Sequence, residues 1–123
     1  MSIPSLFIRT AILLGLAGML LGIFMGINQD FRLAHFHAHW NLLGWVAFFL
    51  YGAYYALVPA ARQGLLPKVH YALALLGLGV FVIGLYGVAL GDDTKTIFAA
   101  IGSLIIVAGF LVFAWIVFRT RIA

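Results

Sequence analysis

The amino-acid sequence predicts an all-α fold: a four-transmembrane-helix bundle that forms a single integral membrane domain over residues 1–123. Two observations lead to this prediction. Of the 123 residues, 66% are hydrophobic and only 8% are charged, which is too little charge to cover the surface of a soluble domain. In addition, four stretches each approach the roughly 20 apolar residues that a helix needs to cross a bilayer. These stretches are residues 5–27, 35–58, 68–90 and 96–118.

Short breaks with turn chemistry separate the four stretches. Polar residues 28–30 end the first stretch, and residues 91–94 close the third. Two prolines, Pro59 and Pro67, bound the break between the second stretch and the third. Because loops this short leave no room for a long crossover, neighbouring helices are expected to run antiparallel.

The distribution of charged residues predicts the orientation of the bundle. One side carries five basic residues: Arg9, Arg62, Lys68, Arg119 and Arg121. The other side carries Arg32, Lys95 and all three acidic residues, Asp30, Asp92 and Asp93. Since Lys and Arg concentrate on the cytoplasmic side, we expect both termini in the cytoplasm and a bacterial inner membrane as the location. The net charge of +4 is interpreted as this topology signal, and no nucleic-acid partner is expected.

Glycines recur at helical spacing in the first and third stretches. They are Gly15, Gly18, Gly22 and Gly26 in the first, and Gly77, Gly84, Gly87 and Gly91 in the third. Small residues at such spacing let helix backbones approach closely inside a bilayer. The spacing favours tight packing within one chain, and a subunit interface is the alternative that it leaves open.

Three histidines at the start of the second stretch are the main functional candidates. His35, His37 and His39 lie within five residues, and ionisable side chains at membrane depth are costly enough to indicate a function. Because each helical residue turns by about 100°, His35 and His39 share a face while His37 points to the opposite side. Asn41 and Gly44 follow the His37 direction, so the helix presents imidazoles both ways.

Neutral imidazole binds heme iron, copper or zinc, and the neighbouring residues favour heme. Gly44 and Trp45, together with Phe36 and Trp40, offer an apolar slot for a planar macrocycle. Arg32 precedes the histidines and is a candidate partner for the heme propionates.

Two further function classes stay open. One is a copper or zinc site formed by the three histidines without heme, and the other is a structural or assembly subunit without a cofactor. Simple anchoring at the headgroups competes with a functional role for His35 and is the favoured interpretation of His70, which lies at the opposite membrane boundary. Tyr51, Tyr54 and Tyr55 are interpreted as an aromatic belt at the inner interface.

The second stretch resembles two heme-binding helices of the heme–copper oxidase superfamily. Residues 37–45, with the sequence HAHWNLLGW, are similar to the H-x-H-x-x-x-L-G-W motif of C-type cytochrome oxidases and nitric-oxide reductases. Residues 39–42 and 54–59 are similar to a second motif, H-x-N-L followed by an aromatic pair and L-V-P. The match covers about a fifth of the chain, and the remainder agrees only in hydropathy and topology.

The resemblance implies a free-standing repeat unit of a twelve-helix catalytic subunit, and hence a homotrimer. It also implies heme b, with His39 and His37 as iron ligands at subunit interfaces; a twofold dimer joined by His39 pairs is the alternative. No H-P-x-V-Y segment for a copper centre is present, so copper is the less favoured metal and oxidase or reductase activity is not expected. The expected role is electron transfer with a redox partner that the sequence does not identify.

Overall fold

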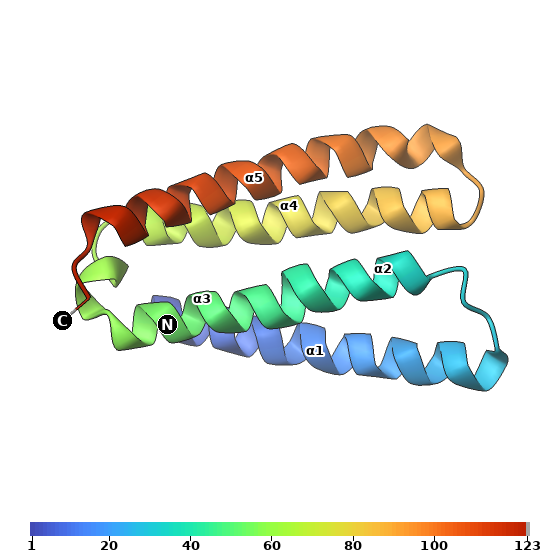
Figure 1. Cartoon of the computed structure of the whole chain (residues 1–123), viewed down its shortest axis with the longest axis horizontal. Coiled ribbons are helices and arrows are strands. Elements are labelled where there is room, and N and C mark those ends of the chain that lie inside the picture. Colours follow the sequence, from blue (N-terminus) through green and yellow to red (C-terminus); the bar gives the residue numbers. More distant parts are fainter. Residues whose placement is uncertain (123) are drawn as a thin grey trace.

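The computed structural model describes residues 1–122, and among them it is all-helical, with 86% of the chain in helices and no strand. Four helical rods lie roughly side by side, and the chain reverses direction between each rod and the next (Figure 1). All four stretches predicted to be helical are helical in the structure. Both termini lie at one end of the molecule (Figure 1).

The first rod is α1, Ile3–Asn28. It begins where the Ser2 hydroxyl accepts a hydrogen bond from the Ser5 N–H, and Pro4 occupies the first turn, where no N–H is needed. It ends at Gln29, whose left-handed backbone (φ 49°) lets its N–H bond back to the last turn. A chain reversal follows directly.

The second rod is one uninterrupted helical run made of three parts. They are α2, Ala34–His39, the π-helical segment η1, Trp40–Val46, and α3, Ala47–Leu57. A short 3₁₀ turn, η2, Pro59–Arg62, then leads to the third rod. A π-helix is a rare departure from α geometry and is frequently found at functional sites. Here it begins directly after His39.

The third and fourth rods form a helical hairpin. They are α4, Leu66–Ala89, and α5, Thr96–Arg119, joined through η3, Asp93–Lys95. Among residues 1–122, three helices have the length and apolar composition to cross a membrane, namely Ile3–Asn28, Leu66–Ala89 and Asp93–Arg119. These features indicate an integral membrane protein.

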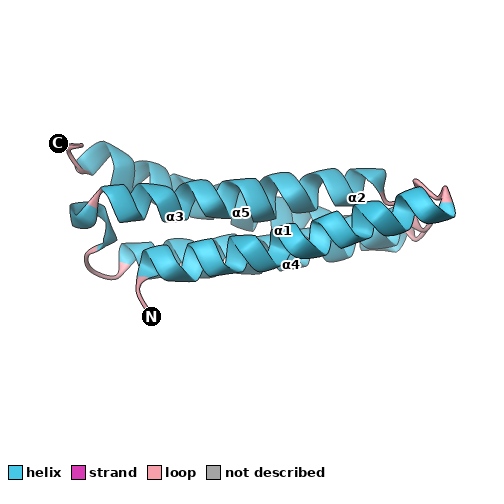
Figure 2. Ribbon diagram, turned by 90° about the horizontal axis from the view of Figure 1, so that it is seen from below, coloured by secondary structure: helices cyan, strands magenta, loops and turns pink. Residues whose placement is uncertain are grey.

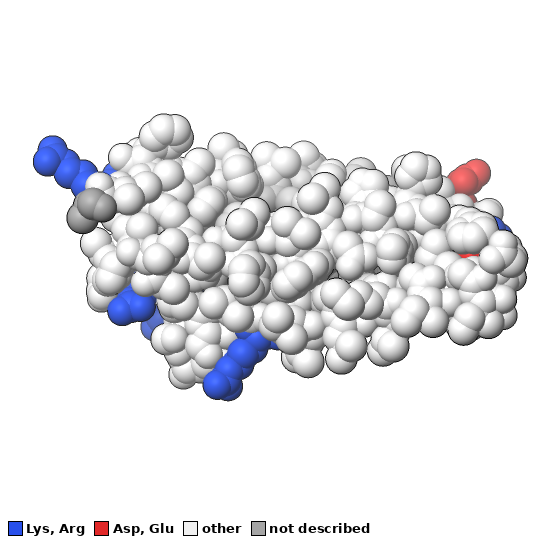
Figure 3. All heavy atoms as spheres, turned by 60° about the horizontal axis from the view of Figure 1, so that its bottom comes forward, with Lys and Arg blue, Asp and Glu red and all other residues white. Residues whose placement is uncertain are grey.

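The rods associate as two pairs. The first rod packs along the second, α4 packs along α5, and the pairs meet mainly where α4 contacts α2, η1 and α1. Figure 2 shows the same elongated layout from a second direction. In the view of Figure 3, most of the visible basic side chains lie on one half of the molecule, whereas the acidic side chains and a small basic patch lie at the opposite end. A broad uncharged surface lies between them.

An aromatic cluster fills the interior toward the end that holds the termini. Phe7 of α1 lies 5.0 Å from the His70 ring and 5.6 Å from the Tyr55 ring, between centroids. Tyr55 and His70 are fully buried, and Tyr51 is half-buried beside them. The expected tyrosine belt is therefore corrected in part, because these rings pack around Phe7 and His70. His70 likewise lies inside the protein and not at the headgroups.

Glycine brings helix backbones together at α4 and α5. A methyl group built on Gly102 would lie 2.5 Å from the Cα atom of Phe81, and one built on Gly84 would lie 2.8 Å from the Cα atom of Ala99. Neither contact can be relieved by a side-chain rotation, since the obstacle is backbone. The expectation of close packing within one chain is therefore met at Gly84, and Gly102 adds a close contact that was not predicted. At Gly26 and Gly91 the expectation is not met, because nothing lies within 4 Å of a methyl group there.

We predict that Gly102→Ala lowers the stability of the protein by about 1–3 kcal/mol, the usual cost of overpacking. The matched control is Gly79→Ala, because nothing lies within 4 Å of a methyl group at Gly79, and alanine favours helix over glycine. Thermal unfolding in detergent, followed by circular dichroism, measures the difference. Equal melting temperatures for the two variants would contradict this account of the packing.

Candidate functional site

The π-helical segment is stabilised from within the second rod and from α1. The side-chain amide of Asn41 donates to the carbonyl of His37 at 2.8 Å, next to the place where the backbone pattern changes. The indole N–H of Trp40 donates to the carbonyl of Leu14 in α1, also at 2.8 Å. Polar side chains that bond to backbone carbonyls allow irregular helix to persist in an apolar medium.

One side of the second rod lies against the glycines of α1. A methyl group built on Gly22 would lie 2.9 Å from Nε2 of His37, and one built on Gly15 would lie 3.0 Å from the Trp45 ring. Gly18 packs in the same way against Asn41. Helix α1 of the same chain therefore packs against three of the candidate ligand-site residues, His37, Asn41 and Trp45.

Gly44 is also enclosed by the protein. A methyl group at this position would lie 3.1 Å from Leu14 and 3.2 Å from Leu78. The space expected to accept a macrocycle is therefore occupied by two leucine side chains. Gly44 and Trp45 thus take part in helix packing within the chain, and the half-buried Trp45 also lines an open groove beside α1. Their role as heme walls stays a prediction.

His39 points the other way, toward α4, with its ring 5.3 Å from that of Phe81 between centroids. Its Nδ1 lies 2.8 Å from the carbonyl oxygen of His35. Because a carbonyl only accepts, Nδ1 must carry the hydrogen, and the neutral ring then keeps a lone pair on Nε2. Metal-binding histidines are commonly oriented by this kind of second hydrogen bond. The half-exposed His39 is thus held in one orientation with a lone pair on Nε2.

The three histidines do not converge on one point. Within residues 1–122, no group of three or more His, Cys, Asp or Glu side chains comes together to hold a metal ion. His37 faces α1 while His39 faces α4, as the helical spacing predicted, and His35 is exposed. A copper or zinc site made by all three histidines of one chain therefore does not match this arrangement.

Arg32 lies in the exposed loop before α2 and is paired with Asp30. Its guanidinium donates to both carboxylate oxygens, at 3.0 Å from Nε and 2.7 Å from Nη2. The side-chain bond from Arg32 is the main cause that lowers the pKa of Asp30. The sequence analysis named Arg32 as a site residue but did not predict that Asp30 pairs with it. The two residues are two positions apart in a turn, and that spacing could have indicated the ion pair.

Sequence reasoning also missed a buried polar pair. The Tyr55 hydroxyl lies 2.9 Å from Nδ1 of His70, and Nε2 of His70 is buried without a hydrogen-bond partner. His70 lies one turn into α4, where the sequence indicates only a membrane boundary. Its burial results from Phe7 and Phe113, which approach from α1 and α5, and no local signal reports such contacts.

Comparison of the chain with protein-family models, with curated proteins and with solved structures finds no match.

We predict that Arg32→Gln raises the pKa of Asp30 toward the ordinary value of an aspartate, because the charge-assisted hydrogen bond is lost. In the unchanged protein the lowered pKa means that the ion pair is intact at neutral pH. It is lost only as the pH falls through that lowered pKa. Carbon-detected NMR titration of the Asp30 carboxyl measures the shift, with Arg119→Gln at the opposite end as the control. An unchanged midpoint in Arg32→Gln would contradict the pairing.

Proposed function

We propose that this chain is a small membrane b-type heme protein in which Nε2 of His39 ligates the heme iron. The observation that carries the proposal is the 2.8 Å bond from His39 Nδ1 to the His35 carbonyl. It leaves Nε2 free and holds the ring in one orientation, which is what an axial ligand requires. The similarity of residues 37–45 to heme-binding helices of the heme–copper oxidase superfamily supports the same choice.

The second iron ligand comes from another subunit in this proposal. His37 and His39 of one chain point to opposite sides of the second rod, so they cannot both reach the same iron. A heme between subunits would be held by His39 of one chain and either His37 or His39 of its neighbour. To ligate iron held by a neighbouring subunit, the His37 ring would have to move away from Gly22 of α1. His39 needs no such movement, because it is already directed away from α1. With His37 as the second ligand, the proposed assembly is a homotrimer that resembles one large oxidase subunit. With His39 as the second ligand it is a twofold dimer, because each His39 can ligate only one iron.

Arg32 supports the placement of a heme near the loop that joins α1 to α2. A cavity of about 330 Å³ lies at this end of the molecule. It is lined by Arg32, Asp30, Tyr86 and four apolar residues, and the histidines lie outside it. A guanidinium at the edge of an apolar site is suited to bind a propionate. Asp30 competes for the same guanidinium, so a propionate bound there would replace part of that ion pair.

The proposed membrane placement has four crossings, with the second rod as the fourth span beside α1, α4 and α5. Positive charge at the end with the termini supports a cytoplasmic location for both, in a bacterial inner membrane. When bound, the heme supplies a one-electron couple. Two imidazole ligands would leave no open position on the iron, so electron transfer is the proposed role, with a redox partner still to be identified.

We predict that His39→Ala abolishes heme binding or reduces it at least tenfold, since the proposed axial imidazole is lost. The matched control is His35→Ala, which removes an exposed imidazole from the same helix and keeps the His35 carbonyl that orients His39. Heme content per chain is measured by pyridine hemochrome assay after purification in the presence of hemin. Full heme content in His39→Ala would refute the assignment.

We further predict that the dithionite-reduced protein shows sharp bands that do not change when carbon monoxide is added. This result follows from two imidazole ligands, because carbon monoxide then finds no vacant iron position. The measurement is the absorption spectrum of the detergent-purified protein before and after the gas is introduced. A shift of the Soret band with carbon monoxide would instead indicate an open site and a gas-binding function.

A further inference from the structure

An apolar groove separates the second rod from α5 at mid-height of the molecule. Its volume is about 410 Å³, and its lining residues are Leu42, Leu43, Val46, Ala47, Leu50, Tyr51, Ile106, Val107, Phe110 and Leu111. Several of these are exposed at the molecular surface, including Leu50, Val107 and Leu111. In a membrane this surface faces lipid, so the groove is open to molecules dissolved in the bilayer.

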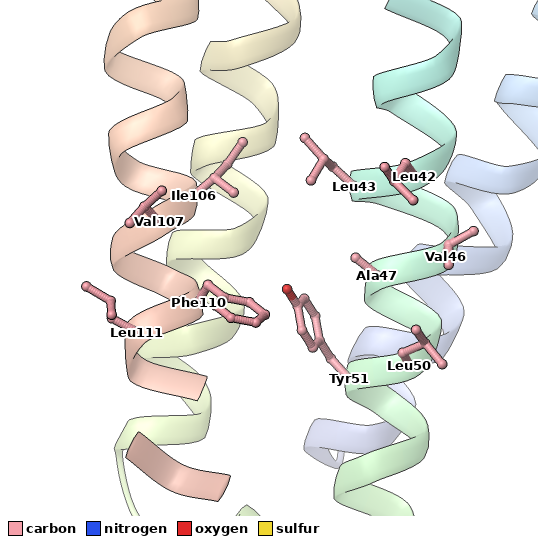
Figure 4. A pocket seen from close by; sticks show the side chains of 10 residues that line it. All are labelled: Leu42, Leu43, Val46, Ala47, Leu50, Tyr51, Ile106, Val107, Phe110 and Leu111. Atoms are coloured by element: carbon pink, nitrogen blue, oxygen red, sulfur yellow. The ribbon is translucent and has the colours of Figure 1, made fainter. Parts of the chain in front are cut away.

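The groove has a polar inner end, which an ordinary gap between helices lacks. Figure 4 shows the Tyr51 hydroxyl pointing from the second rod into the groove, opposite the ring of Phe110 on α5. Behind it lies a small chamber of about 20 Å³, which shares Tyr51 and Phe110 with the groove and is also lined by His70. A chamber of this size has room for roughly one water molecule.

His70 supplies an unmatched hydrogen-bonding atom to this chamber. Its ring is completely buried, Nδ1 is engaged by the Tyr55 hydroxyl, and Nε2 has no partner in the protein. If the Tyr55 hydroxyl donates to Nδ1, Nε2 carries the hydrogen and needs an acceptor. A buried donor without an acceptor is costly, so a water or ligand oxygen is needed there.

We propose that this groove binds a membrane-dissolved quinone, a planar ring with carbonyl oxygens and an apolar tail. The opening toward lipid selects a lipid-soluble molecule. The groove lining carries no charged side chain among the described residues, which favours a neutral head over a phosphate or carboxylate. The Tyr51 hydroxyl offers a hydrogen bond to a carbonyl, and a water in the chamber beside His70 would relay a second one. The Phe110 ring offers a face for stacking.

The proposal is independent of heme, since none of the groove residues is a candidate iron ligand. It is tested by isothermal calorimetry with decylubiquinone titrated into the full chain in lipid nanodiscs, with empty nanodiscs as the blank. Decylbenzene, which has the same alkyl chain and no oxygen, is the matched probe. We expect saturable binding of decylubiquinone and no comparable binding of decylbenzene.

Two variants locate the site. Val107→Trp places an indole in the groove mouth and should weaken binding more than tenfold, whereas Leu104→Trp, on the exposed side of α5 outside the groove, should leave it unchanged. Tyr51→Phe keeps the ring and removes the hydroxyl, and should weaken binding about five- to tenfold, as expected for one hydrogen bond.

Three outcomes would overturn the proposal. They are no saturable binding, equal binding of decylbenzene, or binding that neither Val107→Trp nor Tyr51→Phe reduces. Equal binding of decylbenzene together with a loss in Val107→Trp would identify the groove as a site for lipid acyl chains. Loss of quinone binding in a nanodisc that contains two or more chains per disc, but not in discs with one chain, would mean that a second copy covers the groove instead.

Discussion

Close approach of helix backbones at glycine is the contact on which the rest of this structure depends. In a bilayer, lipid tails are as apolar as leucine, so helices associate through van der Waals contact at short range instead of through release from water. Gly84 and Gly102 bring α4 and α5 together until backbone touches backbone. Gly18 and Gly22 allow a similarly close approach between α1 and the second rod. There, however, the polar side chains of Asn41 and His37 pack against the glycines in place of backbone.

The side chains of residues 35–41 therefore have two different surroundings. His37 and Asn41 sit in the glycine recesses of α1, where they take part in helix packing. His39, two residues from His37, points away from α1 and keeps Nε2 available because its Nδ1 donates to the His35 carbonyl. A single short segment thus contributes to the interior of the chain on one side and presents an imidazole Nε2 with a free lone pair on the other. The proposed intersubunit heme rests on that imidazole, because His37 of the same chain packs against α1.

The polar groups on which the two proposals rest lie in two separate regions. One is near the loop between α1 and α2, where the half-exposed His39 and the exposed Arg32–Asp30 pair lie. The other is the aromatic interior around His70 and Tyr55, behind the groove between the second rod and α5. The proposed heme and the proposed quinone occupy different surfaces of the second rod, so loss of one ligand by mutation need not remove the other. This separation makes the two proposals experimentally independent.

The sequence by itself determined the helices and the directions of the histidines. Apolar stretches of membrane-spanning length set the four rods, and the 100° turn per residue placed His37 and His39 on opposite sides. Only the tertiary structure decided what each side meets. Gly44 and Trp45 turned out to contact Leu14, Leu78 and Gly15, and His70 entered an aromatic interior. The physical reason is that periodicity reports the direction of a side chain from its own helix, whereas the surface it meets depends on contacts between distant parts of the chain.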